Sequence, residues 1–97
     1  MTPAELQNLM RLLEDGLARC GVEIRAESLV ATDGIGSGRG GLCVINERRV
    51  VFVDPRAPLP ERVDVLAGAL AALDPDDIFL PPAVRLAMER VARARRS

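Results

Sequence analysis

The sequence predicts a single α+β domain with the order α-β-β-β-α-α, in which helices pack against a three-stranded, largely antiparallel sheet. The chain has 97 residues, a length that supports one hydrophobic core, so residues 1–97 are expected to form one domain. Helical apolar periodicity occupies both ends of the chain. Between them lie an alternating segment, Val22–Ala26, and two apolar runs around a polar turn, which predict the strands.

The first helix is predicted from a capping box, Thr2-Pro3-Ala4-Glu5, in which Pro occupies the first helical position. An apolar stripe follows, and the helix is expected to end near Arg19 to Gly21. The stripe consists of Leu6, Leu9, Met10, Leu13 and Leu17. In the next segment, VEIRA, apolar and charged residues alternate, which is typical of a strand with one solvated face.

A β-hairpin is predicted from GLCVI and VVFVD, which flank the polar residues Asn46-Glu47-Arg48-Arg49. Both runs are apolar on both faces. Such strands are expected in the middle of a sheet with cover on at least part of each side, whereas the first strand is expected to be more exposed to solvent.

Two helices are predicted to complete the domain. Pro60 suits a first helical position, and Asp74–Asp77 reads as a capping signal for a short turn before the last helix, which is entered at Pro81-Pro82. The second helix has an apolar stripe of Val63, Leu66, Ala67, Leu70 and Leu73, and the last has an inner stripe of Val84, Ala87, Met88 and Val91.

A glycine-rich loop is predicted at about residues 32–41, where ATDGIGSGRGG carries five of the eight glycines. A strand follows these glycines, and no Gly-Lys-Ser/Thr is present, so neither a dinucleotide fingerprint nor a P-loop fits. Two interpretations remain: a flexible connector, or a backbone nest that binds a phosphate or another small ligand. The residues of that candidate loop are Gly36, Gly38, Arg39 and Gly40.

Composition argues against several functions. The net charge is −1 and Trp and Tyr are absent, so neither nucleic acid nor a membrane is expected as a partner. The chain has no His, and no recognisable catalytic constellation, so we expect no enzyme, no metal and no cofactor. No signal peptide is evident at the start, which leads us to expect a cytoplasmic protein with Cys20 and Cys43 as reduced thiols.

Two helices offer candidate interaction surfaces. The second helix is apolar nearly all round, and Gly68, Ala69 and Ala72 would let another helix approach closely. A second copy of the chain would bury this face in a homodimer, whereas the sheet and the last helix would bury it within a monomer. Arg85, Leu86 and Arg93 on the last helix suggest a docking surface for an acidic protein, or merely favourable charges near a helix C-terminus.

The segment CVINERRVVFVDPRAPLPERVDVLAGALAALD resembles the hairpin and active-site helix of the ImmA/IrrE-type zinc metallopeptidases, in which the helix carries Ala-His-Glu-Leu-x-His. Ala67 and Leu70 match that motif. Gly68 and Ala72 occupy the positions of the two zinc-binding His residues, and Ala69 occupies the position of the catalytic Glu. The resemblance therefore implies a related architecture in which every catalytic residue is missing.

The sequence also resembles a group of short bacterial proteins of uncharacterised function. The resemblance rests on Gly40, Gly41 and Cys43, followed by VVFVD, LAGALAALD and DIFLPPAVR. It implies a bacterial cytoplasmic protein with a self-contained domain, and it implies nothing about chemistry. The residues themselves lead us to expect a non-catalytic module for protein–protein interaction or regulation.

Overall fold

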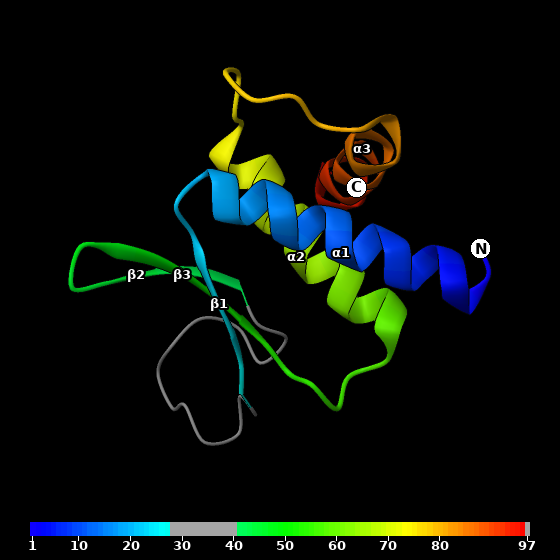
Figure 1. The fold of residues 1–97 in the computed structure, drawn as a ribbon, viewed down its shortest axis with the longest axis horizontal. Coiled ribbons are helices and arrows are strands. Elements are labelled where there is room, and N and C mark those ends of the chain that lie inside the picture. Colours follow the sequence, from blue (N-terminus) through cyan, green and yellow to red (C-terminus); the bar gives the residue numbers. More distant parts are fainter. Residues whose placement is uncertain (28–40, 97) are drawn as a thin grey trace.

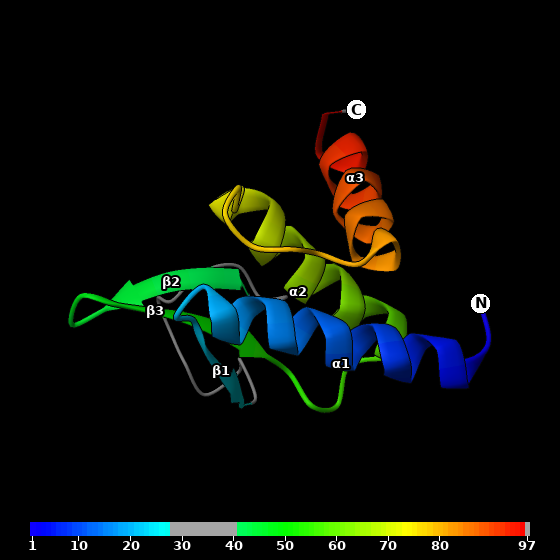
Figure 2. The same ribbon diagram turned by 45° about the horizontal axis from the view of Figure 1, so that its top comes forward.

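The computed structural model describes residues 1–27 and 41–96 and has the predicted order of elements. A three-stranded sheet packs against α1 and α2, and α3 packs on these two helices away from the sheet (Figures 1 and 2). The α+β class is thus confirmed. The elements are α1 (Pro3–Arg19), β1 (Glu23–Ala26), β2 (Gly41–Ile45), β3 (Arg48–Val53), α2 (Leu59–Leu73) and α3 (Pro82–Arg96).

The capping box at the start of α1 is confirmed. The Glu5 backbone amide donates to Thr2 Oγ1 at 3.2 Å, and the Thr2 amide donates to Glu5 Oε1 at 3.1 Å. These bonds satisfy two of the amides that a helix start leaves without intrahelical partners. The apolar stripe of α1 then packs into the core through the buried residues Leu9, Leu13 and Leu17.

The sheet is mixed, with β3 in the middle of the order β1-β3-β2. β2 and β3 form the predicted antiparallel hairpin, whereas β1 pairs with β3 in parallel. The expectation of a largely antiparallel sheet therefore holds for one of the two pairings. Alternation in a strand determines which side chains face the core, but it does not determine the direction or the partner of the strand.

The central strand is covered on both faces, as its sequence predicts. Val51 and Val53 pack against the helices, while Val50 and Phe52 alternate with them onto the opposite face and are also buried. The same prediction is wrong for β2, because β2 is an edge strand and its Val44 side chain is 70% exposed.

The hairpin turn is shorter than the sequence suggests. Ile45 pairs with Arg48, so only Asn46 and Glu47 form the turn, with φ values of 51° and 67°. Two consecutive residues of positive φ twist a hairpin turn to match the twist of its strands. The two arginines that the sequence places in the turn are consequently the first residues of β3.

α2 occupies the centre of the molecule, in contact with α1, α3, β2 and β3. Its buried residues include Val63, Leu66 and Leu70. Asp74 ends α2 in the left-handed conformation at φ 47°, and the stretch from there to Pro81 contains no helical turn. The predicted capping role of Asp74 at the start of a further turn is therefore wrong.

Candidate functional site

The glycine-loop candidate lies outside the described residues. Gly36, Gly38, Arg39 and Gly40 all belong to this part of the chain, and the description resumes at Gly41, the first residue of β2. The phosphate-nest interpretation and the connector interpretation both stay predictions.

The predicted docking face on α2 is corrected by the burial of its residues. Gly68 and Ala69 are buried within the chain, and only Ala72 of the three is exposed. The physical reason is that α1, α3 and two strands surround α2, so a helix that is apolar nearly all round is covered inside one copy. Gly68 and Ala69 are therefore unavailable to a second chain.

The predicted residues on α3 are all exposed. Arg85, Leu86 and Arg93 lie at the surface of the helix, and the Leu86 side chain is 66% exposed. The linker before α3 adds a residue that sequence reasoning missed, Phe79, whose side chain is 72% exposed. Its neighbour Leu80 is buried, and an irregular linker has no periodicity from which this difference could have been predicted.

A side-chain hydrogen bond joins the linker to α3. Arg85 Nε donates to the carbonyl oxygen of Leu80 at 3.3 Å, so the guanidinium reaches back to the residue that follows Phe79. Residues seven apart on a helix share a face, as Leu86 and Arg93 do. We call Phe79, Arg85, Leu86 and Arg93 the α3 surface.

The charges on this side of α3 are predominantly positive. Arg85, Glu89 and Arg93 follow one another at four-residue intervals, so two guanidiniums accompany one carboxylate. Arg90 is engaged with α2, because its Nη2 atom lies 2.6 Å from Asp64 Oδ1. Arg93 has no ion-pair partner within residues 1–27 and 41–94, whose side chains are described.

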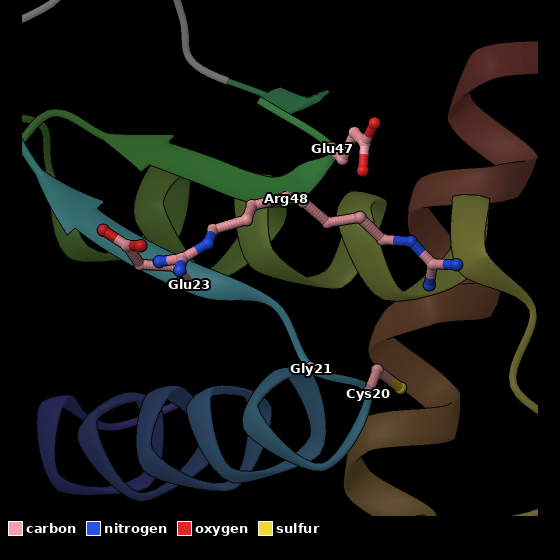
Figure 3. A pocket seen from close by; sticks show the side chains of 6 residues that line it. Cys20, Gly21, Glu23, Glu47 and Arg48 are labelled. Carbon is pink, nitrogen blue, oxygen red and sulfur yellow. The ribbon is translucent and has the colours of Figure 1, made fainter. Parts of the chain in front are cut away.

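An open cleft of about 490 Å³ lies between the C-terminal end of α1 and the hairpin turn (Figure 3). Two structural elements shape it: the turn from α1 into β1, where Gly21 adopts φ 76°, and the tight β2–β3 turn. Its lining is polar and consists of Cys20, Gly21, Glu23, Glu47, Arg48 and Arg49.

The two arginines of the cleft do not form a clamp for an anion. Arg48 and Arg49 are consecutive in β3, so their side chains leave opposite faces of the sheet and do not converge on one ligand. Glu23 is paired with Arg25, with 2.6 Å between Oε2 and Nε, and its hydrogen bond raises the pKa of Arg25. The cleft is a surface of mixed charge.

Cys20 and Cys43 are both free thiols and both half-buried. Cys20 caps the C-terminus of α1, and Cys43 lies on β2 opposite Val50. Within residues 1–27 and 41–96 no three His, Cys, Asp or Glu side chains are grouped closely enough to hold a metal ion. None of the helices there has the length and apolarity needed to cross a membrane.

Comparison with protein-family models, with curated proteins and with solved structures finds no match to this chain. The resemblance to ImmA/IrrE-type metallopeptidases therefore stays a prediction. At the three positions where that resemblance would place catalytic side chains, the structure has Gly68 and Ala69 in the core and Ala72 at the surface of α2. None of these residues offers a metal ligand or a titratable group.

Proposed function

We propose that this protein is a small, non-catalytic interaction module that binds an acidic partner protein through the α3 surface. The observation that supports this most strongly is the exposure of two large apolar residues, Phe79 at 72% and Leu86 at 66%. Leu86 follows Arg85 in α3, and Phe79 precedes Leu80, whose carbonyl accepts a hydrogen bond from Arg85. Aromatic residues and Arg are the residue types most enriched in the centres of protein interfaces.

The exposed apolar area favours a macromolecular partner over a small ligand. Single exposed apolar residues are common on protein surfaces. Here Phe79 and Leu86 are the sequence neighbours of Leu80 and Arg85, which are joined by a hydrogen bond, and together they supply an apolar anchor with a charged rim. The absence of His from the whole chain supports a non-catalytic role, because His is the side chain most often used for acid–base chemistry near neutral pH.

The charge of the surface argues for an acidic partner. Arg85 and Arg93 outnumber Glu89 on this side of the helix, so a partner with carboxylates around an apolar pocket would gain both burial and ion pairing. Exposed pairs of this kind are screened by salt, so the association should weaken as ionic strength rises.

Site-specific photo-cross-linking in cells tests the proposal. A benzophenone amino acid placed at Phe79 or at Leu86 should give the same adduct, and mass spectrometry should locate the cross-link in an acidic segment of another protein. The same photoreactive residue at Ala18, which is exposed on α1, should not give that adduct. The partner identified in this way is then purified and its affinity is measured.

Charge reversal distinguishes specific binding at the α3 surface from nonspecific binding. Arg85→Glu together with Arg93→Glu should weaken binding at least tenfold, or by about 1.4 kcal/mol. The matched control, Arg11→Glu with Arg19→Glu on α1, changes the same net charge and should leave affinity unchanged. Equal effects of the two pairs of substitutions on affinity would contradict the proposal.

A thermal-shift measurement tests the alternative function. A saturable shift with phosphate, ATP or NAD that Arg39→Ala removes would support a small-ligand function for the glycine-rich loop.

A further inference from the structure

The outer edge of β2 carries backbone groups that have no partner in the described chain. The amide of Glu27 donates to the carbonyl of Val53 at 3.1 Å, so the odd-numbered residues of β3 bond toward β1. The even-numbered residues of β3 then bond toward β2, where Val50 is opposite Cys43. On β2 the two residues beside Cys43, Leu42 and Val44, consequently direct their amides and carbonyls outward. We call these outward groups the β2 edge.

This edge lacks the usual protection against pairing with another strand. Native edge strands commonly carry charges, Pro or bulges that discourage association. The opposite edge of the sheet, β1, carries Glu23 and Arg25, whereas Gly41–Ile45 contains no charged residue and no Pro. Val44, which is 70% exposed, adds an apolar side chain to the unprotected edge.

We propose that the β2 edge pairs with β2 of a second copy, antiparallel, about a twofold axis at Cys43. In this register Leu42 lies opposite Val44 of the second copy, and the reverse pair is identical by symmetry. Residues with outward backbone groups then meet in hydrogen-bonded pairs, so two amides and two carbonyls from each chain are all satisfied. The result is a continuous six-stranded sheet formed from two three-stranded sheets.

The chemistry of β2 favours a second copy as the occupant. A twofold axis brings each residue close to its own equivalent, so a charged or bulky residue at the centre would oppose association. The central residue is Cys43, which is small and uncharged, and its neighbours are both aliphatic. Each exposed Val44 would be covered by Leu42 of the other copy. This association does not depend on the α3 surface, which lies on other elements.

The register makes a geometric prediction for Cys43. Directly opposite residues that are not hydrogen-bonded to each other have Cα atoms about 4.5 Å apart. That separation falls within the range of about 4.4–6.8 Å that disulfides span. Mild oxidation should therefore join the two Cys43 thiols: each sulfur gives up one proton and one electron to diamide, which is reduced to its hydrazine as the S–S bond forms.

Oxidative cross-linking of the full chain tests the register. Cys20→Ser should form a dimer with diamide that a reducing agent reverses, whereas Cys43→Ser should not. A register control combines Cys20→Ser, Cys43→Ser and Ile45→Cys. Its introduced thiols would be four residues apart along the paired strands, about 13 Å, so it should not cross-link. Cross-linking of this control as readily as Cys20→Ser, or none in Cys20→Ser, would overturn the proposed pairing.

Sedimentation without oxidant tests the association itself. Val44→Pro removes an amide that points away from β3, so this variant should keep the hairpin and be monomeric where the unaltered chain is dimeric. Val44→Lys, which keeps the backbone intact, should raise the dimer dissociation constant at least tenfold and serves if the proline variant fails to fold. A monomeric mass for the unaltered chain at about 100 μM, or an unchanged dissociation constant in Val44→Lys, would contradict the proposal.

Discussion

Glu5 illustrates how one surface residue links the sequence to helix formation and to pH. Its carboxylate accepts a hydrogen bond from the backbone amide of Thr2, and this bond is the largest cause that lowers the pKa of Glu5 below its ordinary value of 4.5. A hydrogen bond between the Thr2 hydroxyl and the same carboxylate is the second cause. A carboxyl whose pKa is lower in the folded state stabilises the fold above its unfolded pKa. This contribution is lost as the pH falls through the folded pKa.

The two causes can be separated by substitution at Thr2. Thr2→Val removes the hydroxyl but keeps the amide, so the pKa of Glu5 should rise only part of the way toward 4.5. Thr2→Pro also removes the amide at a position whose φ of −76° suits Pro, and the pKa should rise further. NMR titration of the Glu5 carboxyl carbon measures both shifts. An equal pKa in the two variants would show that the backbone hydrogen bond is not the larger cause.

At the scale of elements, the contact between α1 and the neighbouring apolar residues depends on the absence of a side chain at Gly16. A Cβ atom there would lie 3.2 Å from Leu70 Cδ1 and 3.3 Å from Leu80 Cδ2, which is closer than side chains normally pack. Leu70 and Leu80 are both buried, so neither has free space into which it can retreat. Gly16 therefore permits a close approach of α1 to Leu70 and Leu80.

Gly16→Val should lower the free energy of unfolding by about 2 kcal/mol, because overpacking a closed core displaces its neighbours. The matched control is Ala18→Val, on the exposed side of the same helix, where only helix propensity changes and the loss should be about 0.5 kcal/mol. Urea denaturation of both variants gives the comparison. Similar losses in the two would mean that the helices separate at little cost and that Gly16 is not needed for their approach.

Local sequence signals predicted the helices and strands well, but they predicted poorly which strands pair with one another. The capping box at Thr2 and the hairpin follow from short-range chemistry, and both are present. The parallel pairing of β1 and the edge position of β2 depend on how the chain crosses the sheet, which periodicity does not encode. The two-residue turn was missed because Glu47 adopts a left-handed conformation that is unusual for its residue type.

At the scale of the whole molecule, the same distinction explains the candidate surfaces. A helix that is apolar nearly all round indicates burial but does not say whether the cover comes from the same chain. The sequence therefore left both a homodimer face and a monomer core open for Gly68 and Ala69, and the structure buries both residues within one chain. Arg85, Leu86 and Arg93 were predicted correctly as exposed because a charged helical face is a local pattern. The exposure of Phe79 and Val44 is set by the final packing alone.

Both proposals describe a protein that acts through association, and amide hydrogen exchange at β2 tests this most directly. If β2 pairs with a second copy, the amides of Leu42 and Val44 should gain protection as concentration rises from about 10 μM to about 1 mM. The Cys43 amide, which bonds to β3, should be protected throughout, and the outward amide of Ala26 on β1 should stay unprotected. Exchange at Leu42 and Val44 that is fast and independent of concentration would contradict self-association through β2.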